Sequence, residues 1–387
     1  MRGVPRELLL LSIVSGVSGG LLWSVQAPFL RSLGYSGAEY GLLGGIGVVS
    51  GALSTMAAGI LSDRFGARKV LTLGVCIYGL SLLLISRGTL PALILGFTLL
   101  GASNGFYWTS NKALLARLGD DETLHYNLSY YAAAGSLGGA LGSFLGWAPV
   151  YVSRVMGWEL VDAYRASIRI IALTALIAAP LALRVEEARG GGGTNIMGIV
   201  RGIRGPFMRL AVLEMVIGFG AAMSIHNIDY YFALKYGVTS GELGSVFGVQ
   251  QMVMGLLMLK LPGLSDRLGG PLKVYLLVTL SSIPLLIGMT LTSNYLLAST
   301  LYLVRSILMN VATPLFEAFA LSLVPRSFRG VASSILSLSW TLPASGGRVV
   351  GGYLLDINVE LPLRLTALLY TISLTGYAYI GKRLGRL

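Results

Sequence analysis

Charged side chains are scarce in this chain. Asp, Glu, Lys and Arg make up 12% of its 387 residues and hydrophobic residues make up 54%, whereas an ordinary soluble domain has about 25% charged residues. A folded chain of this composition has too few polar groups to cover its surface. The composition therefore excludes an ordinary soluble protein and indicates one that faces lipid.

Residues that usually carry catalysis or hold metals are also few. The chain has one cysteine, Cys76, and two histidines, His125 and His226, far apart in the sequence. A single cysteine excludes an internal disulfide framework. The sequence has no cluster of metal ligands or nucleophiles and no Walker-type nucleotide-binding loop. An integral membrane enzyme is therefore the disfavoured alternative, and we expect no enzyme activity, no metal and no other cofactor.

Long apolar runs fill most of the sequence, and a membrane-spanning helix takes about twenty such residues. The runs are 8–30, 40–61, 70–85, 92–115, 128–151, 168–183, 207–234, 243–264, 274–291, 295–323, 331–355 and 363–380. We therefore predict an all-α membrane protein with twelve transmembrane helices in two pseudo-symmetric six-helix bundles. The bundles are residues 1–184 and 207–387, and residues 185–206 form a cytoplasmic linker whose four consecutive glycines indicate a flexible tether.

Two polar hairpins, each between apolar runs, have similar sequences. Residues 59–71 read GILSDRFGARKVL and residues 263–273 read GLSDRLGGPLK. Their matching aspartates, Asp63 and Asp266, lie 203 residues apart. A duplicated hairpin indicates a duplicated unit, and a membrane protein built from two similar halves is usually a transporter.

The first hairpin resembles the signature loop between the second and third helices of the major facilitator superfamily. The matching residues are Gly59, Leu61, Asp63, Arg64, Gly66, Arg68, Lys69 and Leu71. With the two sets of six runs, the resemblance covers nearly the whole chain and implies a secondary transporter, but the motif carries no information about the substrate. The fifth run has the glycines but not the proline of the drug-exporting branches, so the resemblance does not assign the chain to them.

The same resemblance implies a conformational latch. In the family the loop aspartate docks at the start of the eleventh helix and the basic residues join an ion-pair network, which is favourable because a carboxylate meets the positive end of a helix dipole. The latch residues here would be Gly59, Asp63, Arg64, Gly66, Arg68 and Lys69, with Asp266 and Arg267 in the second copy and Asp120 and Asp121 as counter-charges. The alternative is a solvated basic loop kept for topology.

Basic residues are distributed unevenly between the two sides of the predicted membrane. Twenty lie on the side of the N-terminus, and seven lie opposite: Arg31, Arg87, Arg154, Arg165, Arg169, Lys235 and Arg364. The positive-inside rule then puts both termini in the cytoplasm and the protein in the cell membrane. The formal net charge of +12 thus indicates topology and contact with anionic lipid rather than binding of nucleic acid.

Glycines punctuate two of the runs at helical spacing. They are Gly135, Gly138, Gly139 and Gly142 in the fifth run, and Gly346, Gly347, Gly351 and Gly352 in the eleventh. Such spacing lets helix backbones approach closely in a membrane. It predicts tight packing, with a role in sliding left open.

Ionisable residues inside a span are costly, so each is a candidate functional residue. They are Glu214, His226 and Asp229 in the seventh run, Arg305 and Glu317 in the tenth, and Arg348 in the eleventh. Glu214 carries less weight because it lies nearer the cytoplasmic end. Arg305 and Arg348 are available as cationic partners for Asp229 and Glu317. The sequence alone does not determine which arginine pairs with which carboxylate. A structural histidine and inert ion pairs are the alternatives.

The first half offers polar and aromatic groups instead of central charges. They are Trp23 and Gln26 in the first run, Asn104, Trp108 and Asn111 in the fourth, and Tyr130 in the fifth. A shift of 206 residues places Asn104 over Asn310 and Asn111 over Glu317. Polar positions that recur at matched depth predict helices that line a central substrate cavity. Ordinary packing is the alternative for the tryptophans.

These observations predict a secondary active transporter. It would move a small organic solute, amphiphilic or anionic, by alternating access, as a monomer in lipid. A carboxylate beside a histidine favours coupling to protons, because protonation removes the cost of a buried charge. A passive facilitator or a lipid or drug flippase without proton coupling is the alternative.

Overall fold

The computed structural model describes residues 4–116, 121–185, 205–258, 271–325 and 329–383. The described residues divide into two compact units. The first unit falls within Met1–Gly191 and Phe232–Lys260, and the second within Gly192–Tyr231 and Leu261–Leu387.

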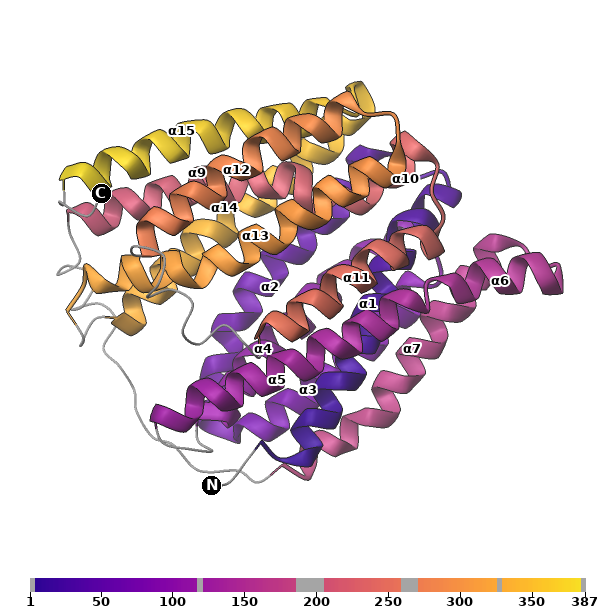
Figure 1. Ribbon diagram of the computed structural model, residues 1–387. Helices are drawn as coiled ribbons and strands as arrows, with labels where there is room; N and C mark the ends of the chain where they lie inside the picture. Colours follow the sequence, from indigo (N-terminus) through magenta and orange to yellow (C-terminus); the bar gives the residue numbers. More distant parts are fainter. Residues whose placement is uncertain (1–3, 117–120, 186–204, 259–270, 326–328, 384–387) are drawn as a thin grey trace. The chain divides into compact units, whose positions relative to one another are not determined.

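The first unit consists of seven long helices and the short helix α6 among the described residues. They are α1 (Arg6–Ser32), α2 (Gly37–Phe65), α3 (Ala67–Ile85), α4 (Leu90–Ala116), α5 (Asp121–Phe144), α6 (Trp147–Met156), α7 (Leu160–Leu183) and α11 (Ser240–Met258). The helix α4 packs on α2 and α3, α7 packs on α1 and α3, and α5 packs on α1 and α11, as the neighbouring ribbons of α1, α5 and α11 show in Figure 1.

The second unit has the same kind of packing. It contains α9 (Pro206–Ser224), the short 3₁₀ helix η1 (Ile225–Asn227), α12 (Pro271–Leu291), α13 (Tyr295–Ser322), α14 (Arg329–Ile357) and α15 (Leu361–Arg383). The helix α10 (Ile228–Tyr236) starts in this unit and ends in the first. The helices α14 and α15 pack on α9, and α13 and α15 pack on α12.

The all-helical prediction is confirmed. The described residues contain no strand, and every one of the predicted runs is helical over most of its described length. Seven of the described spans are long and apolar enough by themselves to cross a membrane. Lipid supplies no hydrogen-bond partners, so a chain that crosses it satisfies its backbone groups within helices.

Two predicted runs are interrupted. The run at 128–151 ends as α5 at Phe144, and α6 begins at Trp147. Pro149 explains the break, because proline has no N–H to donate to the carbonyl of Leu145, four residues before it, and its ring clashes with that carbonyl. The run at 207–234 is interrupted by η1, which separates α9 from α10.

Glycines make a close contact between α1 and α5 in the first unit, as their spacing predicted. A Cβ atom added at Gly138 would collide with the carbonyl oxygen of Ile13, and one added at Gly142 would collide with that of Val17. Close approach of α1 and α5 therefore depends on residues without side chains.

The second unit repeats this contact between α9 and α14. A Cβ atom added at Gly347 would collide with the carbonyl oxygen of Phe219, and one added at Gly351 would collide with that of Met223. Phe219 and Met223 lie 206 residues after Ile13 and Val17, and Gly347 and Gly351 lie 209 residues after Gly138 and Gly142. The same pair of contacts at nearly the same shift supports duplication of one helical unit.

Candidate functional site

The 3₁₀ helix η1 positions the polar residues of the seventh run. The Nδ2 atom of Asn227 donates hydrogen bonds to the carbonyl oxygens of Met223 at 3.4 Å and of Arg348 at 3.0 Å. Asn227 is fully buried. Its amide therefore joins the interrupted helix to the middle of α14, where the backbone of Arg348 lies.

His226 and Asp229 flank this junction. The His226 ring lies 5.3 Å from the Trp340 ring on α14, between centroids, and it is within electrostatic range of Arg348 and Arg305. The Asp229 side chain is buried, and its Oδ1 atom accepts a hydrogen bond from the N–H of Tyr230 at 2.8 Å. The second unit thus brings together predicted site residues from three segments of the chain.

Arg305 on α13 is only 4% exposed. Its Nε atom donates to the hydroxyl of Ser282 on α12 at 3.2 Å, and its Nη2 atom donates to the hydroxyl of Tyr370 on α15 at 2.6 Å. Both hydrogen-bond acceptors are neutral, and no carboxylate in the described part of the chain forms an ion pair with this guanidinium. A buried cation without a paired anion is energetically costly.

Glu317 lies elsewhere in the same unit. Its side chain is exposed, and its Oε1 atom accepts a hydrogen bond from the hydroxyl of Ser333 on α14 at 2.9 Å. Its described hydrogen-bond partner is thus a hydroxyl, and the structure does not bring it to Arg305.

Glu214, to which the sequence analysis gave less weight, is buried and has a defined hydrogen-bond partner. Glu214 on α9 is 8% exposed, and its Oε1 atom accepts a hydrogen bond from the hydroxyl of Tyr377 on α15 at 2.7 Å. The Tyr377 ring packs edge-on against Tyr275 and Phe316. A carboxylate enclosed by aromatic rings is expensive to ionise, and protonation removes that cost. No sequence signal selects Tyr370 or Tyr377, because tyrosines in apolar runs are common here.

Two polar candidates of the first unit are buried, and the amide nitrogen of each donates a hydrogen bond within that unit. The Nε2 atom of Gln26 donates to the hydroxyl of Tyr40 on α2 at 3.2 Å. The Nδ2 atom of Asn111 donates to the carbonyl oxygen of Tyr107 at 2.9 Å, one turn earlier in α4.

The other first-unit candidates are exposed on the isolated chain. They are Trp23, Asn104, Trp108 and Tyr130. Trp23 keeps a ring contact with Phe247 on α11 at 5.8 Å, and Trp108 has an edge contact with Tyr107 at 5.7 Å. Tyr131, the residue after Tyr130, is buried, and its hydroxyl shares a 2.7 Å hydrogen bond with that of Tyr107.

The hairpin between α2 and α3 turns at Gly66, whose φ of 96° favours glycine. Asp63, Arg64 and Lys69 are exposed there, and the Arg64 guanidinium lies 5.3 Å from the ring of Phe65. Gly59 and Arg68 are intermediate in exposure. The counterparts Asp266 and Arg267, and also Asp120, lie outside the described residues.

Among the described residues, no group of three or more His, Cys, Asp or Glu side chains could hold a metal ion. The candidate site is therefore one of hydrogen bonds, buried charges and aromatic faces. Such groups bind and orient a ligand.

Comparisons of sequence identify relatives along nearly the whole chain. The chain is 22% identical to Multidrug resistance protein 2 of Bacillus subtilis over 363 residues, which cover 92% of this chain and 89% of the relative. It is 23% identical to Multidrug resistance protein 1 of the same organism over 382 residues, covering 96% of this chain and 95% of the relative.

Solved structures show the same fold. A bacterial homolog of the human lysosomal transporter Spinster, in an inward-facing and occupied conformation, matches with a TM-score of 0.78 at 14% identity, over 97% of this chain and 96% of that one. The nucleoside transporter NupG matches with a TM-score of 0.76 at 14% identity, over 97% of this chain and 98% of that one.

These relatives are transporters rather than enzymes, and the chain is a multi-pass membrane transporter that binds small-molecule substrates. The family model described as Major Facilitator Superfamily matches residues 8–347. The chain therefore belongs to the Major Facilitator Superfamily.

Proposed function

We propose that the chain is a secondary active transporter that moves a small organic solute with an anionic group by alternating access, coupled to protons. It acts as a monomer in the cell membrane. Both termini lie in the cytoplasm, as the excess of basic residues on that side of the membrane favours. The observation that carries the substrate class is Arg305, a buried cation whose hydrogen-bond partners are both neutral hydroxyls.

An anionic substrate would supply the charge that Arg305 lacks. A guanidinium presents a planar fork of donors that matches a carboxylate or phosphate. The hydroxyls of Ser282 and Tyr370 hold the fork in place without neutralising it, so the cost of its burial falls when an anion binds.

An amphiphilic substrate is supported by aromatic rings in the same unit. Trp340 lies against His226, and the Tyr370 ring lies 5.6 Å from the Arg305 guanidinium carbon. Two relatives named multidrug resistance proteins also favour an organic solute with apolar area. Their names say nothing about a negative charge, which is the addition made here from Arg305.

Proton coupling is supported by buried acids. Asp229 is buried within the cluster that holds His226, and a protonated carboxyl and an ionised one favour different surroundings. A proton that binds one conformation better than the other shifts the equilibrium between them. Asp229 is therefore the proposed coupling group.

The test uses purified protein in liposomes that contain a pH-sensitive dye, with a panel of amphiphilic carboxylates added outside. We expect solute entry to be accompanied by proton movement, and Asp229→Asn to abolish that movement. The matched control is Glu159→Gln, which neutralises an exposed acid just before α7.

Two outcomes would contradict the proposal. Solute uptake by the unchanged protein without any proton movement would favour the passive facilitator or flippase. If Asp229→Asn still accumulates solute against its gradient, Asp229 is not the coupling group.

A further inference from the structure

An open pocket of about 610 Å³ lies in the first unit, at the end of α3 and the beginning of α7. Its lining contains Arg87, Arg165 and Arg169, together with Asp162, Trp158, Ala166 and Ile170. In the proposed topology α1 crosses the membrane outward, α2 returns, and α3 crosses outward again. The pocket at the end of α3 is therefore on the outer face. Three of the seven basic residues assigned to that face line it.

The positive-inside rule makes this concentration unusual. Basic residues are depleted from loops on the outer side, and three cations that share one pocket repel one another unless an anion lies among them. A negative charge among these arginines would therefore lower the electrostatic energy of the pocket.

Asp162 supplies only part of that charge. Its Oδ1 atom pairs with the Nη1 atom of Arg165 at 2.9 Å. Arg169 donates from Nε to the hydroxyl of Ser86 at 3.3 Å, which leaves its two terminal nitrogens for another ligand. Arg87, the residue next to Ser86, has no ion pair or hydrogen bond to any side chain in the described part of the chain.

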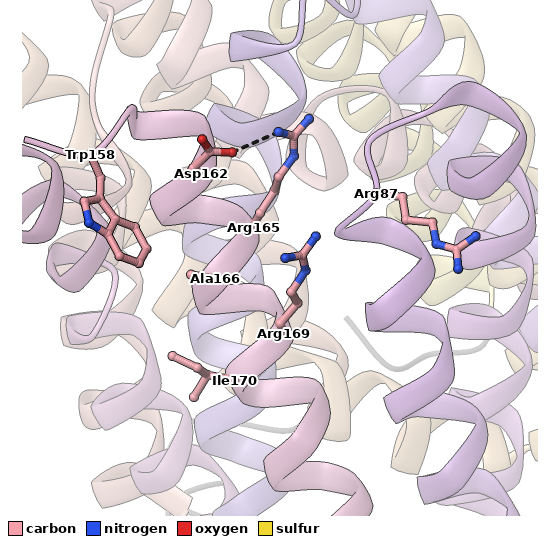
Figure 2. Close-up of a pocket in the computed structure, with 7 residues that line it drawn as sticks. All are labelled: Arg87, Trp158, Asp162, Arg165, Ala166, Arg169 and Ile170. Atoms are coloured by element: carbon pink, nitrogen blue, oxygen red, sulfur yellow. Dashed lines mark hydrogen bonds and ion pairs between the residues drawn. The ribbon is translucent and has the colours of Figure 1, made fainter.

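The pocket has two chemically different flanks. Figure 2 shows Arg165 and Arg169 extending from α7 toward the side on which Arg87 lies, whereas Trp158 and Ile170 lie on the other side of the helix. In this view the Arg87 side chain extends away from α7. Because Arg87 is exposed, a change of rotamer can turn its guanidinium toward the other two arginines. Ile170 is 62% exposed, and Leu173 and Ile177 continue the exposed apolar face further along α7. Tryptophan prefers the boundary between headgroups and hydrocarbon.

We propose that this pocket binds the phosphate group of an anionic ligand, held by Arg87 and Arg169 with help from Arg165. Guanidinium groups bind phosphate oxygens in pairs of charge-assisted hydrogen bonds. The phosphate can come from the headgroup of a phospholipid or from a phosphate ester dissolved in water. The exposed apolar face beside the arginines fits the acyl chain of a lipid, so the lipid is the source that the geometry favours.

The experiment measures binding by the shift in thermal unfolding of the full chain in a neutral detergent, because a ligand stabilises the state that it binds. The probes are phosphatidylglycerol, phosphatidylcholine and glycerol 3-phosphate, each titrated separately. We expect phosphatidylglycerol to bind most tightly. Arg87→Gln should weaken its binding about tenfold, the usual effect of losing one charge-assisted hydrogen bond.

Two further variants make the result specific. Arg154→Gln removes an exposed arginine of α6 that does not line the pocket, and it should leave binding unchanged. Asp162→Asn frees Arg165 from its ion pair, and it should tighten binding. A gain in affinity cannot result from misfolding.

The outcomes separate the sources. Stabilisation by phosphatidylglycerol but not by glycerol 3-phosphate identifies a lipid headgroup, and equal dependence of both probes on Arg87 identifies a free phosphate ester. If Arg87→Gln and Arg169→Gln each bind both probes as tightly as Arg154→Gln does, the proposal is wrong. These measurements do not involve transport, so they stand or fall independently of the proposed function.

Discussion

Two buried charges of the second unit are held by hydroxyls of one helix. Tyr370 accepts a hydrogen bond from Arg305, and Tyr377 donates one to Glu214. The two tyrosines lie seven residues apart on α15, so they share a face of that helix. A hydroxyl can donate or accept, so a tyrosine accepts from Arg305 at one position and donates to Glu214 at the other without adding a charge to either site.

Removal of the Tyr377 hydroxyl tests this arrangement at the scale of single residues. In Tyr377→Phe the ring still packs on Tyr275 and Phe316, but Glu214 loses its donor. A buried acceptor left unsatisfied costs about 1–3 kcal/mol, so the midpoint of thermal unfolding should fall. Tyr379→Phe is the control, because Tyr379 is exposed on the same helix.

A double change shows whether the loss comes from this hydrogen bond. If it does, Tyr377→Phe should cost much less in a Glu214→Leu background than in the unchanged protein. Equal costs in both backgrounds would mean that the hydroxyl does not stabilise Glu214.

Glycine contacts dominate the packing at the scale of helices. In each unit, the helix formed by the fifth run of a set of six lies on the helix formed by the first run, through glycines that face backbone carbonyls. Burial of apolar area gives helices no driving force to associate in lipid, so close backbone contact replaces it. The same contact between α1 and α5 and between α9 and α14 is what duplication of one helical unit predicts.

Replacement of these glycines should be costly only where the backbone approaches closely. Gly351→Ala places a methyl group against the carbonyl oxygen of Met223, and we expect a loss of about 1–3 kcal/mol in stability, typical of overpacking. Gly346→Ala is the matched control, since the nearest atom to its added Cβ would be 3.7 Å away, on Phe219. A thermal unfolding midpoint for Gly351→Ala equal to that of Gly346→Ala would contradict the predicted clash.

The sequence predicted the helices well because each depends on a long apolar run. It did not predict the breaks at Pro149 and η1, because a proline or a pair of polar residues inside an apolar run does not decide whether the helix bends or ends. For the site, rarity of charge selected His226, Asp229 and Arg305. The partners Tyr370, Tyr377 and Ser282 gave no signal, because their contacts depend on which helix faces are packed together, and apolar periodicity is weak in buried membrane helices.

At the scale of the whole molecule, the proposed alternating access requires changes in conformation. The hairpin between α2 and α3 is a candidate for biasing them, because Asp63, Arg64 and Lys69 are exposed there and free to meet other charges as the molecule changes state. An exposed carboxylate contributes little to folding. Its replacement should therefore affect the conformational equilibrium more than stability.

We expect Asp63→Ala to slow transport severely while leaving the thermal unfolding midpoint nearly unchanged. The physical reason is that the proposed latch contact would stabilise one conformation relative to another, so its loss would shift their populations without disturbing packing within either unit. Asp63→Glu keeps the charge and should retain part of the activity, whereas Asp63→Asn should resemble Asp63→Ala. Transport at the normal rate by Asp63→Asn and Asp63→Ala would mean that the hairpin carries charge for topology alone.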